Sequence, residues 1–429
     1  MGIYNITGGK KLYGQLKIGG GKNAILPILA SVVLNGSESV IHNCPKISDT
    51  LISIEMLQSI GCKIKQEEDT LIVDSSGADN WNVPASLVRE MRSSFIFLGG
   101  VLSRFGKCNI SYPGGCALGE RSIDLHLMAF RKLGATIIED HGFIYCYADK
   151  LTGARINLSK PSVGATENIM LSAVFAEGET IIDNAAREPE IQDLQIFLNG
   201  MGAKITGAGS SQIIIQGVKK LHKVEHTVMP DRIVAGTFLT AAAMTGGKVR
   251  LTHINPDHLY PITSKLTETG CSIRMEKKSV YLEAPAKLRS IDVITNPHPG
   301  FPTDMQPQFT ALTTLADGVS VIKETVFESR NRHIAELKRM GADITLTDGM
   351  TFFTRGVKKL NGAPVEAMDL RGGAALILAG LAAEGKTTVT NSHFVERGYE
   401  KIEESLRAIG ADVTFEQKIE RSQNVRSVK

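Results

Sequence analysis

Five charged residues and one glycine recur at matching positions along the chain, each fourteen residues before a glycine that closes a long, nearly uncharged stretch. The six positions lie 67–72 residues apart, at Lys22, Arg92, Gly164, Arg232, Asp304 and Arg371. Each falls at the expected start of a helix, where the first backbone N–H groups are unpaired and the helix dipole is positive. The sequence therefore indicates equivalent helix starts that favour bound anions.

The first of these positions follows three glycines, in Gly19-Gly20-Gly21-Lys22-Asn23. Glycines allow a backbone to approach a ligand closely, and lysine adds a mobile positive charge. The segment is not a Walker A loop, because Leu16 stands in place of its first glycine and Asn23 in place of its Ser/Thr. Both a phosphate site and a plain glycine turn remain open at this point.

A second glycine-rich segment, 113–121 (PGGCALGER), carries a cysteine. An exposed Cys116 near Arg121 would have its thiolate favoured, which makes it a candidate nucleophile or proton donor. The alternative is a buried loop cysteine without chemistry. Asp124 and His126 begin the helix that follows, where donors suited to phosphate and ribose hydroxyls could gather.

Other charged residues also stand at expected helix starts. Asp304, in FPTDMQP, is a candidate base, and its alternative is an N-terminal cap. Arg371 and Arg397 could each clamp a carboxylate or phosphate through two hydrogen bonds, although each alone also fits a solvated surface arginine. The segment 160–164 (KPSVG) suits a diphosphate.

The elements that position these residues follow one pattern. The first helix of each repeat is apolar nearly all round, as in 24–34, 95–102 and 374–383, which predicts burial on every side. The second is amphipathic, as in 125–133 and 401–409, and the segment 204–216 reads as strand–turn–strand. Glycine ends both kinds of helix and predicts left-handed C-caps, the second set at Gly61, Gly134, Gly202, Gly270, Gly341 and Gly410.

Each repeat is therefore a βαβαββ module of an α/β fold, with its helix inside and its sheet outside. Six modules are too many for one core, so we expect two three-module domains, 22–229 and a discontinuous 1–21 with 230–429. Residues 1–21 are expected to form a strand pair that completes the last module. The alternative is a single solenoid of six repeats.

Composition narrows the class of protein. A net charge of +3 without a basic run argues against nucleic acid as a partner, and 42% hydrophobic with 22% charged residues is typical of a globular protein. The N-terminus lacks a signal-peptide core and no apolar run reaches membrane-spanning length, so a cytoplasmic location is expected. The six cysteines form no metal-binding spacing and read as reduced thiols; we expect no metal and no cofactor.

Seven motifs taken together resemble one family. They are GGGKNA at 19–24, PGGCALGERSIDLH at 113–126, NAAREPEI at 184–191, PDRIVAGT at 230–237, FPTDMQPQ at 301–308, DLRGGAAL at 369–376 and RGYEKI at 397–402. The chain thereby resembles the UDP-N-acetylglucosamine 1-carboxyvinyltransferases, enolpyruvyl transferases of bacterial peptidoglycan synthesis, from about Tyr4 to Phe415. The resemblance implies two inside-out α/β barrels that hold the substrates phosphoenolpyruvate and UDP-N-acetylglucosamine between them, reacting through a tetrahedral ketal.

The resemblance also implies roles for individual residues. Asp304 would accept the proton of the sugar 3′-hydroxyl, and Cys116, on a lid, would donate a proton to phosphoenolpyruvate. Lys22, Arg121 and Arg397 would hold phosphate, with Arg371 near the carboxylate and Asn23 at the tetrahedral carbon. The nucleotide sugar would contact Arg92, Arg121, Ser122, Ile123, Asp124, Leu125, Lys160, Ser162, Val163, Gly164 and Val326.

Two departures and three rival interpretations accompany the resemblance. Ser122 stands where the family usually has proline, and Ser93 where alanine is expected after Arg92. The rivals are a shikimate-pathway enolpyruvyl transferase, which should lack the Cys116 loop, a catalytically silent nucleotide-sugar-binding protein, and a hydrolase with Cys116 as nucleophile and His126 as base. We expect a monomer without a nucleic-acid or membrane partner.

Overall fold

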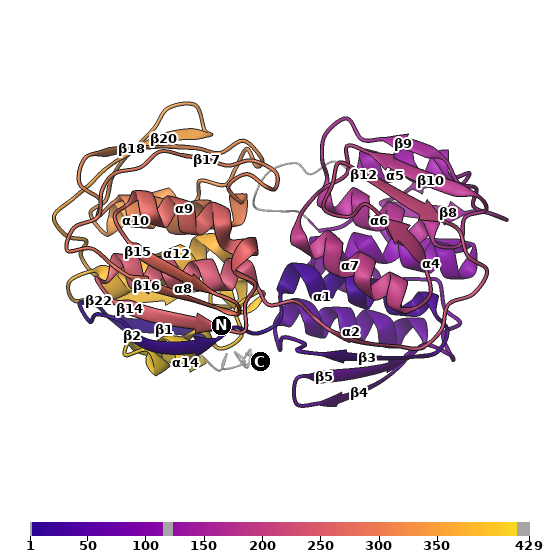
Figure 1. Ribbon diagram of the computed structural model, residues 1–429, viewed down its shortest axis with the longest axis horizontal. Helices are drawn as coiled ribbons and strands as arrows, with labels where there is room; N and C mark the ends of the chain where they lie inside the picture. The colour runs from indigo at the N-terminus through magenta and orange to yellow at the C-terminus, as the bar shows by residue number, and fades with distance from the viewer. Residues whose placement is uncertain (1, 115–122, 418–429) are drawn as a thin grey trace, which may run out of the picture.

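The computed structural model of the chain describes residues 2–114 and 123–417. Its buried apolar side chains form two separate cores, one from residues 24–228 and one from residues 4–18 and 233–413. We call the parts of the chain around them the first lobe and the second lobe, which lie side by side in Figure 1. A single solenoid of six repeats is therefore wrong, since a solenoid stacks its repeats over one continuous core.

The centre of each lobe consists of helices that are buried on nearly every side. Every residue from Arg371 to Leu381 in α12 is buried, for example. Figure 1 shows these helices stacked inside, with sheets around them. The central helices are α1 (Lys22–Ser31), α4 (Phe97–Phe105), α6 (Val163–Ala173), α8 (Arg232–Met244), α10 (Gln306–Thr313) and α12 (Leu370–Ala382). This arrangement confirms the expected inside-out α/β fold, because apolar faces all round leave no side for water.

The second helices pack with one face on the core. They are α2 (Ser48–Ile60), α5 (Asp124–Lys132), α7 (Pro189–Gly200), α9 (Tyr260–Glu268), α11 (His333–Arg339) and α14 (Ile402–Ala408). All twelve glycines that were expected to end helices have a positive φ, between 58° and 108°. The left-handed C-cap prediction is confirmed where the glycine directly follows a helix, as at Gly61 and Gly106. It is wrong for Gly178, Gly318 and Gly385, which lie directly before strands, beyond the ends of α6, α10 and α12.

Six small sheets form the outer layer. The first lobe has β13-β3-β5-β4, β6-β8-β7 and β11-β12-β10-β9, built from β3 (Glu38–His42), β4 (Lys63–Glu67), β5 (Thr70–Asp74), β6 (Lys107–Ser111), β7 (Thr136–Asp140), β8 (Phe143–Tyr147), β9 (Arg155–Asn157), β10 (Glu179–Asp183), β11 (Lys204–Thr206), β12 (Gln212–Gln216) and β13 (Val224–Thr227). The β11 and β12 strands confirm the strand–turn–strand reading of 204–216.

The second lobe repeats this plan with strands from both ends of the chain. Its sheets are β15-β16-β14-β2, β17-β18-β20-β19 and β21-β22-β1-β23, built from β1 (Gly2–Thr7), β2 (Tyr13–Lys17), β14 (Lys248–Thr252), β15 (Ser272–Glu276), β16 (Ser279–Glu283), β17 (Val293–Ile294), β18 (Val319–Lys323), β19 (Asp343–Leu346), β20 (Thr351–Arg355), β21 (Pro364–Glu366), β22 (Lys386–Thr390) and β23 (Asp412–Gln417). Each four-stranded sheet of this lobe thus has two antiparallel pairings and one parallel pairing, as β15-β16-β14-β2 shows.

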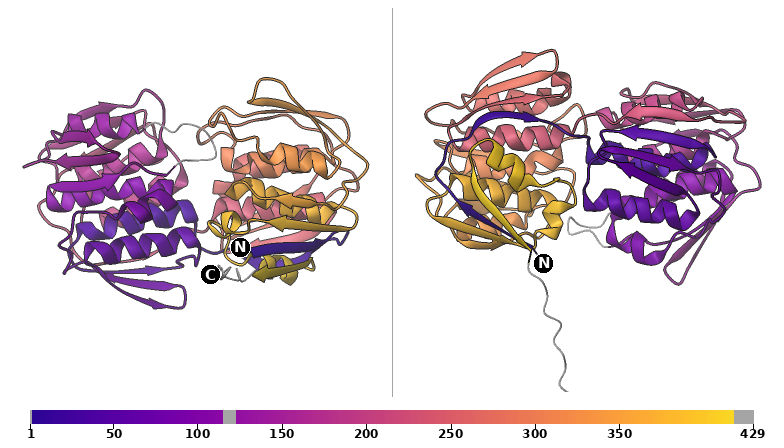
Figure 2. Two further views of the ribbon diagram at one scale, coloured as in Figure 1. Left: turned by 180° about the vertical axis from the view of Figure 1, so that it is seen from behind. Right: turned by 90° about the horizontal axis from the view of Figure 1, so that it is seen from below.

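At the junction, the last strand of each lobe's segment leads into the first central helix of the other lobe. The strand that leads into α1, β2, pairs in parallel with β14 of the second lobe, whereas β13, which leads into α8, pairs in parallel with β3 of the first. The two chain crossings run beside each other, with Gly21 N–H donating to Met229 O at 2.8 Å and Asp231 N–H donating to Gly19 O at 2.9 Å. Figure 2 shows the indigo N-terminal segment running along the second lobe before it enters the first. The starts of α1 and α8 are thereby brought side by side.

The first 21 residues do not form a strand pair. β1 lies between β22 and β23, while β2 lies in another sheet beside β14. Because β1 is hydrogen-bonded to strands on both of its edges, it has no free edge left for β2. The expectation that both strands complete the last module is therefore correct for β1 and wrong for β2.

Replacing Gly61 with alanine is expected to destabilise the protein by about 1–2 kcal/mol, since its φ of 104° is costly for a residue with a Cβ. The added Cβ would also lie 3.0 Å from Gly77 O. Gly77→Ala is the matched control, because its φ is not in the left-handed region and its nearest contact is 3.7 Å. Urea unfolding of the two variants measures the difference. Equal urea midpoints for Gly61→Ala and Gly77→Ala would show that a side chain at position 61 does not strain the C-cap of α2.

Candidate active site

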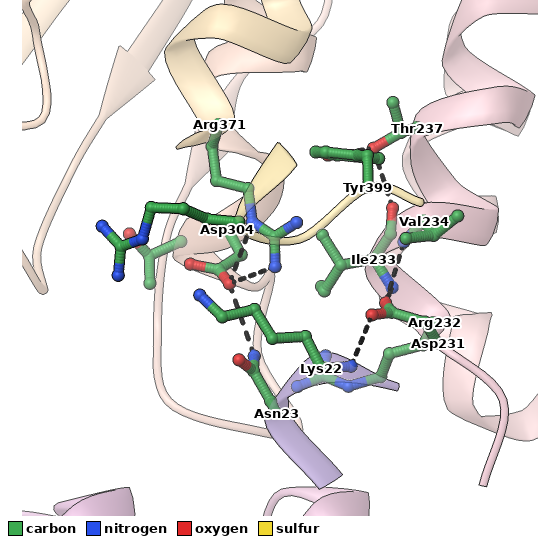
Figure 3. A network of polar contacts seen from close by, with 12 residues as sticks. Lys22, Asn23, Asp231, Arg232, Ile233, Val234, Thr237, Asp304, Arg371 and Tyr399 are labelled. Carbon is green, nitrogen blue, oxygen red and sulfur yellow. Dashed lines mark hydrogen bonds and ion pairs between the residues drawn. The ribbon is translucent and has the colours of Figure 1, made fainter. Parts of the chain in front are cut away.

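Asp304 lies at the junction of the two lobes and is held by two arginines. It is the second residue of a short 3-10 helix, η4 (Thr303–Met305), that leads into α10. Its Oδ2 accepts hydrogen bonds from Arg371 Nη2 at 3.0 Å and Nε at 3.2 Å, and its Oδ1 accepts one from Arg330 Nη1 at 2.9 Å. Asn23 Nδ2, from the first lobe, lies 3.5 Å from Oδ2 (Figure 3). The structure therefore brings Asp304, Arg371 and Asn23 together, as predicted.

The electrostatics of Asp304 are set by these arginines. Burial opposes ionisation, but the charges of Arg371 and then Arg330, with their hydrogen bonds, hold the pKa of the Asp304 carboxyl well below its usual value. The carboxylate in turn raises the pKa of Arg371, against the effect of burial. Asp304 is thus an anion at neutral pH and, with both arginines in contact, a weak base.

A second carboxylate, Asp49, holds the other two predicted cations. Its side chain is fully buried in the first turn of α2. Lys22 Nζ lies 2.7 Å from Oδ2, and Arg397 donates from Nε to Oδ1 at 2.9 Å and from Nη2 to Oδ2 at 3.2 Å. Burial lowers the pKa of Lys22, while the Asp49 charge raises it. Lys22 and Arg397 are therefore neighbours, as the family resemblance implied.

At several of the predicted helix starts, a side chain of the protein itself accepts the hydrogen bonds of the first backbone N–H groups. Asp231 accepts hydrogen bonds from the first N–H groups of α8 and, through its other oxygen, from Lys22 N–H at the start of α1. Asp369 caps α12 in the same way, and Ser162 caps α6. The three glycines before Lys22 thus lie where the chain passes from the second lobe to the first, beside Asp231. The N–H group of Lys22 is already hydrogen-bonded, so an anion bound there would have to replace a carboxylate (Figure 3).

A second group of predicted residues lies in the first lobe. Arg92 begins η2 (Arg92–Ile96), and its charge acts on His126, which with burial lowers the pKa of that ring to about 3. His126 Nδ1 lies 2.8 Å from Asn168 Nδ2, and its ring lies close against Gly164. Around them are the other predicted nucleotide-sugar residues of this lobe, Ile123, Asp124, Leu125, Ser162 and Val163, with Lys160 exposed. The His126 ring is therefore neutral, and its Nδ1 faces the side-chain amide of Asn168.

Val326 comes from the second lobe and lies in a turn organised by Glu324. Its N–H donates to Glu324 Oε1 at 2.8 Å, and Glu324 Oε2 accepts from the Thr303 hydroxyl at 2.9 Å. Thr303 also accepts from Arg330 Nη1 at 2.9 Å. Because Val326 is 38% exposed and attached to this network, it borders the Asp304 site.

Three predicted residues, Cys116, Arg121 and Ser122, lie outside the described residues. The remaining five cysteines are buried and free. Burial raises the pKa of the Cys44, Cys62 and Cys146 thiols to about 12. These thiols are core side chains rather than reactive groups.

Sequence reasoning missed two residues of the site, Asp49 and Arg330. Asp49 was detectable, because helical spacing puts it on the buried face of α2 with Ser53, Met56 and Ile60, where a carboxylate needs a partner. Arg330 lies in the loop before α11 and gave no signal. Its side chain is 3% exposed and reaches Asp304 only through the tertiary fold.

Within residues 2–114 and 123–417, no group of three or more His, Cys, Asp or Glu side chains could hold a metal ion. In the same ranges, no helix is both long and apolar enough to cross a membrane.

Glu167 makes stability depend on pH. It is 2% exposed in α6, and burial, followed by the charges of Glu190 and Glu188, raises its pKa well above the usual value. A carboxyl whose folded pKa is raised stabilises the fold while protonated, so stability is lost as pH rises from its unfolded pKa through its folded pKa. Each pH unit in that window costs about 1.4 kcal/mol.

Glu167→Gln is therefore expected to stabilise the protein at pH 8, with an advantage over the original that shrinks toward pH 5. Denaturant unfolding at both pH values measures this. Glu55→Gln, at an exposed position of α2, is the matched control and should show the same pH dependence as the original chain. A Glu167→Gln advantage that is the same at both pH values would contradict the assignment.

Known proteins similar to this chain show its family. The family model described as EPSP synthase (3-phosphoshikimate 1-carboxyvinyltransferase) matches residues 6–406. UDP-N-acetylglucosamine 1-carboxyvinyltransferase 2 of Caldanaerobacter subterraneus subsp. tengcongensis is 49% identical over 414 residues, covering 96% of this chain and 99% of that protein. The chain belongs to the UDP-N-acetylglucosamine 1-carboxyvinyltransferase family. UDP-N-acetylglucosamine 1-carboxyvinyltransferase 1 of Symbiobacterium thermophilum is similar to it at 50% identity over 96% of this chain and 94% of that protein.

Solved structures agree with this family on the fold. The enolpyruvyl transferase NikO from Streptomyces tendae superimposes with a TM-score of 0.88 at 27% identity, covering 96% of this chain and 98% of that one. EPSP synthase from Acinetobacter baumannii has a TM-score of 0.76 at 19% identity, covering 97% of this chain and 100% of that one, which shows the fold alone. The two relatives named above, at 49% and 50% identity, carry the UDP-N-acetylglucosamine name rather than the shikimate one.

Proposed function

We propose that this protein transfers the enolpyruvyl group of phosphoenolpyruvate to the 3′-hydroxyl of UDP-N-acetylglucosamine and releases phosphate. The observation that carries the proposal is the Asp304 carboxylate, held by Arg371 and Arg330 at the lobe junction and faced by Asn23 from the other lobe. An anionic base among fixed cations suits a reaction between two anionic substrates. The half-identical relatives support the choice of acceptor.

The proposed chemistry is addition followed by elimination. The 3′-oxygen attacks C2 of phosphoenolpyruvate while its proton passes to Asp304, and Cys116 protonates the methylene carbon C3. The tetrahedral ketal then loses phosphate from C2 and a proton from C3, which restores the double bond. The proton lost from C3 passes to the Cys116 sulfur, and the proton that Asp304 accepted passes to the departing phosphate. Asp304 and Cys116 thus end in their starting forms.

Arg371 provides a means of activating Asp304. Its Nη1 is buried and has no hydrogen-bond partner among the described residues, so an anionic substrate group there would meet an available donor. A substrate carboxylate that draws Arg371 away from Asp304 would remove the largest favourable charge interaction that holds the pKa of Asp304 down. The base would therefore gain strength when phosphoenolpyruvate is bound.

The other predicted residues bind substrate in this proposal. Lys22, Arg121 and Arg397 hold the phosphate, and Asn23, 3.5 Å from Asp304, contacts the oxygens of the tetrahedral carbon. The nucleotide sugar occupies the region of Arg92 and Gly164, with Ile123, Asp124, Leu125, Lys160, Ser162, Val163, Val326 and Ser122. The Cys116 loop acts as a lid that excludes water. Residues 22–229 and 1–21 with 230–429 act as two domains that close on both substrates.

The proposal extends to the role in the cell. The reaction is the first committed step of bacterial peptidoglycan synthesis, and so belongs to cell wall biogenesis, cell shape and cell division. The protein acts in the cytoplasm as a monomer, without a cofactor, a nucleic-acid partner or a membrane. Fosfomycin inhibits it by reacting with Cys116.

Phosphate release from phosphoenolpyruvate tests the proposal, with UDP-N-acetylglucosamine or shikimate 3-phosphate as acceptor and with or without fosfomycin. We expect release only with the sugar nucleotide, and none after fosfomycin. Release with shikimate 3-phosphate would assign the other acceptor, and no release with either would leave a silent binding protein. Release that fosfomycin does not affect would retain the reaction but remove Cys116 from its role.

A further inference from the structure

Asp49 connects cations that come from different lobes. Lys22 is the first residue of α1 in the first lobe, and Arg397 follows α13 (His393–Glu396) in the second. Both are within 3.2 Å of the Asp49 carboxylate, which comes from α2 of the first lobe. A single buried carboxylate therefore fixes the distance between Lys22 and Arg397.

The segment after Arg397 is held to the same part of the first lobe at a second point. Lys46 N–H, just before α2, donates to Glu400 Oε2 at 2.9 Å. An acidic residue that only complements a helix dipole would need neither contact, because the dipole acts on the helix's own first turn. The two contacts show that the start of α2 and the segment from Arg397 to Glu400 dock on each other.

The geometry leaves both cations ready for a further anion. The Asp49 carboxylate contacts the Nζ of Lys22 and accepts hydrogen bonds from Nε and Nη2 of Arg397. Among residues 2–114 and 123–417, no other acceptor holds the remaining N–H groups of the two side chains, so they can donate to a further anion. Two adjacent cations with free donors are a binding site suited to phosphate, whose charge both would share.

We propose that Asp49 is the positioning residue of the phosphate-binding cations: it holds Lys22 and Arg397 side by side and so couples phosphate binding to the approach of the lobes. The inference rests on the proposed function, in which these two side chains bind the phosphate of phosphoenolpyruvate. Asp49 itself touches no substrate, and acts only through Lys22 and Arg397.

The charge of Asp49 also has a consequence for pH. The groups that face Lys22 are Asp49 from α2, Arg397 from the segment after α13 and Arg371 from α12. Burial and both arginines lower the pKa of Lys22, and Asp49 raises it. Without the Asp49 charge the pKa of Lys22 falls further, so its proton is lost at a lower pH. Affinity for phosphoenolpyruvate should then decline at a lower pH than in the original chain.

Asp49→Asn tests the inference in the full chain, with the KM for each substrate, kcat and their pH profiles as readouts. We expect the KM for phosphoenolpyruvate to rise roughly tenfold or more, since a hydrogen-bonded charge partner is lost. The KM for UDP-N-acetylglucosamine should change little, and the alkaline limb of kcat/KM for phosphoenolpyruvate should move to lower pH. Glu55→Gln removes a charge from the exposed face of the same helix and should leave all three unchanged.

Asp49→Glu keeps the charge and covers the case in which the asparagine variant fails to fold. It should raise the KM for phosphoenolpyruvate without moving the alkaline limb. Calorimetry with inorganic phosphate on the substrate-free protein should show weaker binding for both variants. Unchanged phosphate binding and an unchanged pH profile in a folded variant would overturn the inference. If the original chain releases no phosphate with either acceptor, the proposed function fails first, and the calorimetry still decides whether Asp49 organises an anion site.

Discussion

Replacing Asp304 with asparagine is expected to lower kcat for phosphate release by about 10²–10⁴-fold, the range for loss of a general base. Asparagine keeps the shape and the hydrogen-bond contact with Asn23 but cannot accept the proton of the sugar hydroxyl. The loss should appear in kcat more than in the KM for UDP-N-acetylglucosamine, because the interaction lost belongs to the transition state. Steady-state kinetics with both substrates measures it.

Two checks separate this result from misfolding. Arg371 and Arg330, which are themselves buried, lose their carboxylate partner in the variant, so thermal unfolding and equilibrium binding of UDP-N-acetylglucosamine must accompany the kinetics. Asp317→Asn, an exposed carboxylate of the same lobe paired with Lys287, is the control and should keep full activity. If folded Asp304→Asn retains kcat within a few-fold, Asp304 is a structural anion and another group removes the proton.

Replacing Arg232 with methionine is expected to destabilise the protein by about 3–5 kcal/mol, the cost of breaking a buried ion pair on one side. Arg232, at the start of α8, donates to Glu190 of α7 from Nε at 2.9 Å and Nη2 at 3.3 Å, with both side chains 7% exposed. Glu188 and Glu167 lie close to this pair. Loss of the guanidinium therefore leaves several carboxyl groups together without their cation.

Denaturant unfolding of two further variants tests the cause. Arg155→Gln removes an arginine from the solvent-exposed pair with Asp183, and its effect should be much smaller, because water screens that pair. Adding Glu190→Leu to Arg232→Met should recover stability, since the uncompensated carboxylate is removed as well. A double variant less stable than Arg232→Met would mean that packing, rather than the buried charge, explains the loss.

The sequence by itself determined the features that depend on neighbouring residues. The six helix starts, from Lys22 to Arg371, fall within the first two residues of α- or 3-10 helices, as the repeat predicted. The glycine stops, Gly61 and Gly106 among them, all have left-handed backbones. Burial of the central helices followed from their composition. These properties are predictable because periodicity, helix capping and apolar content act over a few turns of chain.

The tertiary structure alone decided which distant segments meet. β2 lies directly before α1 of the first lobe but pairs with β14 of the second lobe. β13 lies directly before α8 of the second lobe but pairs with β3 of the first, so long-range strand pairing decides the lobe of each strand. The same folding brings Asp49 between Lys22 and Arg397 and places Arg330 on Asp304. The local sequence pattern does not predict such contacts, because the segments that meet are far apart in the chain or lie in an irregular loop. A buried charge needs a partner, and only the folded chain shows which residue supplies it. The repeat therefore predicted that cationic residues stand at helix starts, and the fold determined which carboxylate pairs with each of them.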